Sequence, residues 1–120
     1  MNTPESSAPP LVSVIAVSYN HERFVLETLE SIKRQTLRDF ELIYLDDASP
    51  DRTVEIAGPW LDQQSFPIRR VLHQQNQGVC KTFNEGVSLA TGKYVQIIAC
   101  DDLLKPHKLK SQTQLLASLP

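Results

Sequence analysis

The chain of 120 residues is 41% hydrophobic and 22% charged, and its 12 basic and 14 acidic side chains leave a net charge of −2 at pH 7. This length suits a single domain, and the near balance of charge excludes a surface that attracts nucleic acid or an anionic membrane as a whole. No stretch approaches the ~18 consecutive apolar residues that a membrane span needs. We therefore expect no nucleic-acid partner.

The N-terminal segment indicates where the folded domain begins, and the two cysteines indicate the cellular compartment. Residues 1–9 are polar and lack the basic start and apolar run of a signal peptide, so we expect a disordered tail followed by one domain over residues 10–120. Cys80 and Cys100 form no CxxC pair and no metal-ligand spacing with histidine, which favours reduced thiols in a cytoplasmic protein. A disulfide between them stays open, and a place at the inner face of the membrane would depend on regions outside these residues.

The first third of the chain predicts a strand, a turn and a helix. Leu11–Ser18 (LVSVIAVS) is uncharged and rich in valine, as in a strand that is covered on both faces. The turn YNHE follows, and Asn20 is expected to cap a helix over about residues 22–35. Apolar residues recur in that helix at helical spacing: Val25, Leu29 and Ile32.

A second strand and helix follow the same order. Phe40–Leu45 (FELIYL) predicts a strand, and the turn-forming stretch DDASPDRT ends it. A short helix is expected to begin near Thr53 and to stop or bend around Pro59. Ile68–His73 (IRRVLH) predicts a weaker strand at an edge of the sheet.

The last part repeats the alternation once more. An apolar stripe of helical period predicts a helix that Gly92 ends, and Tyr94–Ala99 (YVQIIA) predicts the fourth strand. Pro106 suits the first turn of a final helix that carries Leu109 and Leu116. The stripe consists of Val79, Phe83, Val87 and Ala90.

Regular alternation of strand and helix predicts an α/β fold with three layers, in which helices cover both faces of a mostly parallel sheet. Ligands of such sheets bind beyond the carboxyl ends of the strands. Polar residues gather at each of those ends: Ser18, Tyr19 and Asn20; Asp46, Asp47, Ser49 and Asp51; Asn76 and Gly78; Asp101 and Asp102. We therefore expect four carboxylates, with Asp51 as a possible fifth, at one edge of the sheet.

The adjacent carboxylates of Asp101 and Asp102 repel each other unless a cation or a proton intervenes. Oxygen ligands suit Mg²⁺ or Mn²⁺, which take their remaining ligands from water and substrate phosphates. The chain contains no glycine-rich phosphate loop, so a metal would have to hold the phosphates of a diphosphate ligand.

Each of these clusters has a simpler interpretation. Asp46 and Asp47 could begin a turn in which Asp51 caps the next helix, and the segment 76–78 could be only a loop that leads into a helix. Lys81 is expected to be a solvated surface group, and Tyr19 could pack over the sheet edge. The histidines are also expected at the solvated surface, and no pair of them has a metal-ligand spacing: His21, His73 and His107.

The order of these segments resembles the nucleotide-binding half of the family 2, GT-A type glycosyltransferases. PLVSVIAVSYN is similar to the opening strand of that family, and ETLESIKRQTLRDFELIYLDDASPDRT to its first helix, second strand and Asp-Asp-x-Ser-x-Asp turn. NQGVCKTFNEGVSLATGKYVQIIACDD is similar to its series Asn-x-Gly, Asn-x-Gly and Ala-x-Gly-x-Tyr, which ends at the metal-binding acidic motif. The resemblance runs from about Pro10 to about Leu116 and implies a Rossmann-like domain that is incomplete at its C-terminal end.

What the resemblance implies is transfer of a sugar from a nucleotide-diphosphate donor, expected to be a UDP-sugar, to a hydroxyl of a saccharide or lipid-linked acceptor. This chemistry is typical of bacterial polysaccharide biosynthesis. Val17 and Tyr19 would border the nucleotide, with Tyr19 near the base, and Asp47 would accept a hydrogen bond from the uracil N–H. Lys81, expected on the loop after the third strand, would approach the nucleotide.

The resemblance places Asp101 and Asp102 in the acidic motif. Asp101 would contribute to both the nucleotide site and the metal site, and Asp102 would be the direct ligand of Mn²⁺ or Mg²⁺ on the diphosphate. A metal that bridges both phosphates stabilises the negative charge that grows on the leaving oxygen.

The chain departs from the family pattern at several positions. Many members have proline where Ser18 stands, an Ala-Arg pair where Thr82 and Phe83 stand, and another aspartate where Ala99 stands. The catalytic base is expected from a region beyond Pro120, so we expect little turnover from these residues alone. Hydrophobic surface left uncovered here is also expected to support a homodimer.

Two other classes of protein fit parts of the pattern. A non-catalytic module that binds nucleotide or protein on the same fold remains open, because Ala99 replaces an acid. A phospho-receiver domain has a similar length and alternation, but it needs an acidic pair after the first strand, where this chain has SYNHE.

Overall fold

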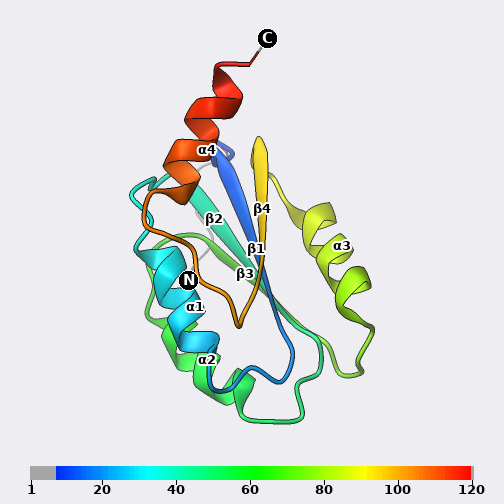
Figure 1. The fold of residues 1–120 in the computed structure, drawn as a ribbon. Helices are drawn as coiled ribbons and strands as arrows, with labels where there is room; N and C mark the ends of the chain where they lie inside the picture. Colours follow the sequence, from blue (N-terminus) through cyan, green and yellow to red (C-terminus); the bar gives the residue numbers. More distant parts are fainter. Residues whose placement is uncertain (1–7, 120) are drawn as a thin grey trace.

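The computed structural model describes residues 8–119, so most of the expected N-terminal tail lies outside the described residues. Strands and helices alternate along the chain (Figure 1). Their bounds are β1 Val12–Ser18, α1 Val25–Lys33, β2 Phe40–Asp46, α2 Thr53–Asp62, β3 Ile68–Leu72, α3 Val79–Leu89, β4 Tyr94–Ala99 and α4 Lys108–Ala117. No helix within residues 8–119 is long and apolar enough to cross a membrane.

The four strands form one sheet in the order β3-β2-β1-β4, and every pair is parallel. β1 lies in the interior of the sheet and is buried along its whole length. Val17 pairs with Leu45 of β2 and with Ala99 of β4, so the carboxyl ends of these three strands lie side by side. The predicted parallel sheet, with β3 at an edge, is confirmed.

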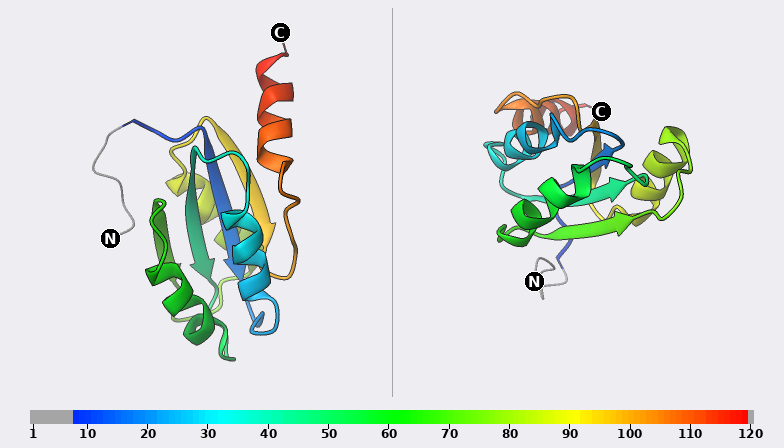
Figure 2. Two further views of the ribbon diagram at one scale, coloured as in Figure 1. Left: turned by 90° about the vertical axis from the view of Figure 1, so that its left-hand side faces the viewer. Right: turned by 90° about the horizontal axis from the view of Figure 1, so that it is seen from below.

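Helices cover both faces of the sheet, which confirms the predicted three layers. The helices α1, α2 and α4 lie on one face and α3 lies on the other (Figure 2). Alternate residues of β1 serve the two faces, because Val14 packs in the larger cluster with α1 and α2, and Ile15 packs in the smaller cluster against α3. The buried residue Gly86 lets α3 approach the sheet, since a Cβ atom there would lie 2.4 Å from Cγ2 of Ile15.

The structure contradicts two predicted details of the helices and part of a third. α1 begins at Val25, and Asn20 adopts a φ of 61° without capping it, because a run of turns separates the two. Of the stop or bend expected at Pro59, the stop does not occur, because α2 continues to Asp62 and one missing N–H does not outweigh the packing of its apolar face. Pro106 precedes α4 by two residues rather than lying in its first turn.

Candidate functional site

A small cavity of about 170 Å³ opens at the carboxyl ends of the strands. It brings together three of the residues that the sequence predicts for nucleotide binding: Val17, Tyr19 and Asp47. Ala99, at the end of β4, forms part of the same wall. The remaining lining residues are His21, Asn76, Gly78 and Val79.

Asp47 lines this cavity with only 1% of its side chain exposed. Its Oδ1 atom accepts hydrogen bonds from the backbone N–H of Gln77 (2.8 Å) and from His73, and its Oδ2 atom accepts one from the N–H of Gly78 (3.0 Å). Gly78 adopts a φ of 97°, a backbone conformation that favours glycine. Burial by itself would raise the pKa of Asp47, but the hydrogen bonds from His73, Gln77 and Gly78 outweigh it and lower the pKa below its usual value.

His73 is not a solvated surface group, and that expectation is wrong. Only 6% of its side chain is exposed, and its ring lies between two carboxylates. Nδ1 is 2.9 Å from Oδ1 of Asp47, and Nε2 is 2.6 Å from Oε1 of Glu85 on α3. The hydrogen bond with Asp47 raises the pKa of His73, and the bond and charge of Glu85 add to the rise, while burial opposes it. His73 directly follows β3, at the carboxyl ends of the strands where ligands bind, and this position in the sequence was the signal that it could belong to the site.

Asp46 does not join the carboxylates at the open edge, which corrects the expected cluster of four. It is buried and accepts hydrogen bonds from Ser18 (2.6 Å) and from the hydroxyl (2.6 Å) and N–H (2.9 Å) of Ser49. Because the Ser18 hydroxyl donates to Asp46, it accepts from the hydroxyl of Tyr44, 2.6 Å away. Burial raises the pKa of Tyr44, so the phenol stays a donor. The hydroxyl of Ser18 is thereby satisfied as both donor and acceptor.

Asp51 also serves the local structure, as the simpler interpretation predicted. Its carboxylate accepts hydrogen bonds from the N–H of Thr53 at the start of α2 (3.0 Å) and from the N–H of Glu22 (3.1 Å). Burial opposes the shift, but the bonds to Thr53 and Glu22 lower the pKa of Asp51. Asp51 therefore ties the turn after β2 to the turn after β1.

The loop after β1 places Tyr19 and His21 at the rim of the cavity. Tyr19 is 43% exposed, and its backbone N–H donates to Nδ1 of His21 (3.2 Å). Nε2 of His21 lies 3.7 Å from Oδ2 of Asp101, so His21 links the cavity to the acidic pair. The expectation that His21 is a solvated surface group is therefore wrong, whereas His107 is exposed as expected.

Asp101 and Asp102 are exposed just beyond β4 and do not line the cavity. Helix α1, together with Gln35 just beyond its end, holds their segment through buried polar side chains that the sequence did not single out. Thr28 donates to the carbonyl of Asp102 (2.6 Å), the hydroxyl of Ser31 accepts from the N–H of Leu104 (3.1 Å), and Gln35 donates to the carbonyl of Lys105 (2.7 Å). The spacing of Thr28 and Ser31 on one face of α1, with Gln35 two residues beyond its end, was the available signal.

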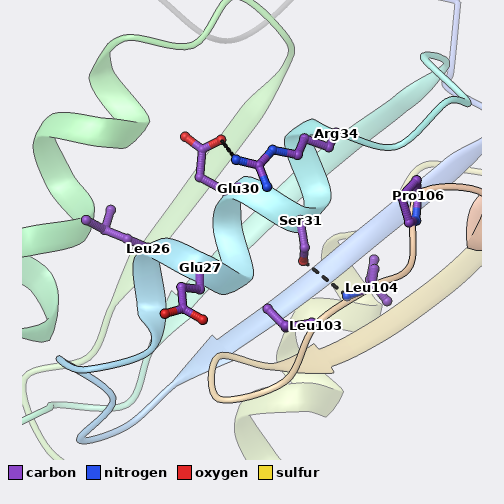
Figure 3. Close-up of a pocket in the computed structure, with 8 residues that line it drawn as sticks. All are labelled: Leu26, Glu27, Glu30, Ser31, Arg34, Leu103, Leu104 and Pro106. Carbon is purple, nitrogen blue, oxygen red and sulfur yellow. Dashed lines mark hydrogen bonds and ion pairs between the residues drawn. The ribbon is translucent and has the colours of Figure 1, made fainter.

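Two larger hollows lie elsewhere on the surface. One of about 460 Å³ runs between α1 and residues 103–106, where the Ser31–Leu104 hydrogen bond and the ion pair of Glu30 with Arg34 (3.8 Å) are visible (Figure 3). The other, of about 580 Å³, includes Leu11 and Lys93 at the opposite end of the strands. Neither of them includes the polar residues that gather at the carboxyl ends, so the small cavity is the candidate site.

The donor set of the acidic pair suits a hard divalent cation. Asp101 and Asp102 offer exposed carboxylate oxygens, and Oδ1 of Asp102 accepts the N–H of Leu103 (2.9 Å), which orients that carboxylate. Among residues 8–119, no group of three or more His, Cys, Asp or Glu side chains is arranged to hold a metal. A cation here would therefore take its other ligands from a diphosphate and water, as Mg²⁺ commonly does.

Two further expectations concern residues near the cavity. Lys81 lies in the first turn of α3 and not on a loop, because the helix already begins at Val79, and its side chain is exposed outside the cavity lining. Cys80 is exposed and Cys100 is buried, and both are free thiols, so the open question of a disulfide is resolved. Burial raises the pKa of the Cys100 thiol.

Comparison with known protein families and sequences gives one consistent result. Residues 13–120 match the sequence model of the family described as Glycosyl transferase family 2. Glycosyltransferase EpsJ of Bacillus subtilis, described as uncharacterized, is 37% identical over 105 residues, which are 88% of this chain and 30% of that protein. Glycosyltransferase GlyG of Streptococcus pneumoniae is 35% identical over 105 residues, 87% of this chain and 34% of that protein. The chain thus spans about a third of the length of these relatives.

Solved structures agree with the sequence comparison. TarS of S. aureus (residues 1–349), in complex with UDP, superposes with a TM-score of 0.79 at 27% identity and covers 88% of this chain and 32% of that one. The mannosyltransferase PcManGT of Pyrobaculum calidifontis, in complex with GDP-Man and Mn²⁺, has a TM-score of 0.81 at 25% identity and covers 99% of this chain and 35% of that one. The predicted fold is confirmed.

Proposed function

Since this chain belongs to glycosyl transferase family 2 and has the GT-A type fold, we propose that it forms the donor-binding part of a transferase that uses a UDP-sugar and a divalent metal. The transferred sugar would pass to an acceptor hydroxyl. The observation that carries the proposal is the cavity at the strand ends, which is lined by the buried carboxylate of Asp47 and by the exposed residue Tyr19. Its lining residue His21 lies 3.7 Å from the exposed carboxylate of Asp101.

Each residue of the site has a definable task in this proposal. Tyr19 offers a ring at the rim against which a base can stack, and Val17 forms apolar wall. The lowered pKa keeps Asp47 ionised, so its carboxylate accepts a hydrogen bond from the N–H of a uracil ring. Oδ2 is the oxygen with room for this bond, because it accepts only one of the three hydrogen bonds described above.

Asp101 and Asp102 would hold Mn²⁺ or Mg²⁺ together with the diphosphate. When bound, such an ion supplies Lewis-acid stabilisation of the charge on the departing nucleoside diphosphate. His21, 3.7 Å from Asp101, would hold the loop after β1 close to the acidic pair. The catalytic base and the acceptor site are proposed to come from sequence outside these residues, and Lys81 is proposed to reach the phosphates from the first turn of α3.

Calorimetric titration with UDP, in the presence and absence of Mn²⁺, tests the proposal. We expect binding that strengthens with Mn²⁺ and that loses this dependence in Asp102→Ala. Asp47→Ala should weaken the binding of UDP about tenfold or more, because a hydrogen bond to a charged group contributes about 1.5–3 kcal/mol.

Asp39→Ala is the matched control, since Asp39 is exposed just before β2, at the opposite end of the strands. Failure of the unaltered chain to bind UDP with or without Mn²⁺ would reject the donor-site proposal. That result would favour the alternative, a module that binds protein on the same fold.

A further inference from the structure

The imidazole of His73 connects the candidate base-binding carboxylate to the surface of α3. It follows β3 directly, where its backbone N–H donates to the carbonyl of Asp46 (2.9 Å) and fixes the main chain next to β2. From there the ring reaches Asp47 through Nδ1 and Glu85 through Nε2. Side chains from three parts of the fold therefore form one hydrogen-bonded series, Glu85–His73–Asp47.

The two carboxylates of this hydrogen-bonded series differ in their exposure. Asp47 is 1% exposed, while the side chain of Glu85 is 40% exposed on α3. A buried carboxylate keeps one rotamer only if its partners hold it, and the side-chain partner of Asp47 is His73. Glu85 in turn sets the position of the His73 ring, because it bonds to the nitrogen that points away from Asp47.

We propose that His73 and Glu85 are positioning residues for nucleotide recognition, which hold the Asp47 carboxylate with Oδ2 directed toward the base. This inference rests on the proposed function, since it assigns a role to residues that touch Asp47 and not the ligand. His73 and the N–H of Gln77 occupy Oδ1, and the N–H of Gly78 takes one of the two acceptor positions of Oδ2. The remaining acceptor position of Oδ2 is the one offered to a donor in the cavity.

The protonation state of His73 decides whether this arrangement is complete. The charged groups that face the ring are Asp47 at the end of β2 and Glu85 on α3. A cationic imidazole donates to both carboxylates, whereas a neutral one has a single N–H and directs a lone pair at the other carboxylate. The hydrogen bond with Asp47 and the charge of Glu85 raise the pKa of His73 against the opposing effect of burial. Base recognition should therefore weaken when the pH rises past that pKa.

The test is the affinity for UDP-GlcNAc as a function of pH, between about pH 5.5 and 9 with Mg²⁺ present. This ligand is a suitable probe because its doubly esterified diphosphate does not titrate in that range. We expect the affinity of the unaltered chain to fall about threefold to tenfold across the titration of His73, as for the loss of one hydrogen bond. His21 also borders the cavity, so the contribution of His73 is the difference between the unaltered chain and a His73 variant.

Three variants separate positioning from folding. His73→Asn keeps an amide N–H near the position of Nδ1 but carries no charge, so its affinity for UDP-GlcNAc should depend less on pH. His73→Leu should bind UDP-GlcNAc more weakly than His73→Asn at every pH. Glu85→Gln removes one negative neighbour and should shift the midpoint of the affinity profile, and of the His73 imidazole NMR titration, to lower pH. Glu55→Gln on α2 is the matched control, because Glu55 is exposed and pairs with Arg52.

The outcomes distinguish this inference from the proposed function. Two results would overturn the positioning role alone. In one, the unaltered chain binds UDP-GlcNAc and His73→Asn binds it with the same dependence on pH. In the other, the midpoint of the His73 imidazole titration is unchanged in Glu85→Gln. Absence of UDP-GlcNAc binding at every pH would overturn both. If His73→Asn does not fold, Glu85→Gln decides the question, since its side chain is partly solvated.

Discussion

The hydroxyl of Thr28, in the middle of α1, donates a hydrogen bond of 2.6 Å to the main-chain carbonyl of Asp102. The two residues are 74 positions apart in the sequence, and the bond fixes the backbone next to the acidic pair. Helix α1 therefore determines where the proposed metal ligands lie, although it contributes none of them.

Thr28→Val is expected to weaken UDP binding in Mn²⁺ about threefold to tenfold and to leave metal-independent binding unchanged. Valine has nearly the same shape as threonine but no hydroxyl, so the Asp102 carbonyl loses its donor and the free energy of unfolding falls by about 1 kcal/mol. Calorimetry and urea denaturation measure the two effects. Thr36→Val is the control, because Thr36 is exposed and its 3.3 Å bond to the Pro106 carbonyl is long. Full Mn²⁺ dependence in Thr28→Val would contradict the anchoring role of α1.

Gly86→Ala is expected to destabilise the fold by about 1–3 kcal/mol, the usual cost of overpacking a core. The new methyl group would lie 2.4 Å from Cγ2 of Ile15 and 3.0 Å from Cδ1 of Leu45, so α3 would have to move off the sheet. Gly58→Ala in α2 is the matched control, because a Cβ atom there meets nothing within 4 Å and alanine favours the helix by about 0.5–1 kcal/mol. Thermal unfolding should shift the two variants in opposite directions, and a stable Gly86→Ala would show that α3 packs less closely than described.

The free energy of unfolding should depend on pH through Asp47 and His73, with opposite signs. The pKa of His73 is raised in the fold, so its contribution is complete below about pH 6.5 and is lost as the pH rises through the folded-state pKa. The pKa of Asp47 is lowered, so its contribution is complete above its usual pKa and is lost as the pH falls through the folded-state value.

Urea denaturation over a pH series measures this dependence, and one proton corresponds to a slope of at most about 1.4 kcal/mol per pH unit. His73→Asn should flatten the decline above pH 6.5. His107→Asn is the control, because the His107 ring is exposed and bonds to the hydroxyl of Thr36 instead of a carboxylate. An equal decline in His73→Asn would rule out His73 as its origin.

Self-association through β4 is also expected. This edge strand contains no charged residue, and Val95 and Ile97 are 44% and 49% exposed, so a second copy can cover them and pair with the free edge. Size-exclusion chromatography with light scattering should find a dimer that Ile97→Lys converts to monomer. Leu72→Lys is the control, because Leu72 is exposed on the other edge strand, which already carries Arg69 and Arg70. A chain that stays monomeric at high concentration would contradict the prediction.

The arrangement of strands and helices was predictable because apolar runs and turn residues punctuate this sequence clearly. The runs LVSVIAVS, FELIYL and YVQIIA each became a strand within one residue of the predicted bounds. The stop that was one expected outcome at Pro59 does not occur, because local propensity ignores the tertiary packing that carries α2 past it.

The candidate site was predictable to the extent that topology alone places residues. Val17, Tyr19 and Asp47 meet at one cavity because parallel strands end at the same edge. Which carboxylates stay open depends on partners distant in sequence, and the sequence does not reveal them. Ser18 and Ser49 enclose Asp46, and the pairing of His73 with Asp47 crosses 26 positions.

The register of β1 has a consequence for the order of folding. β1 pairs with β2 about one βαβ unit away, whereas its pairing with β4 joins Val12 to Tyr94 and closes a much longer loop. Pairing over such a sequence separation is slow, because the entropy of loop closure is lost before the contacts form. We therefore expect the strand ends that carry Val17 and Ala99 to come together late, after the transition state of folding. A nucleotide bound there should slow unfolding and leave the rate of folding almost unchanged.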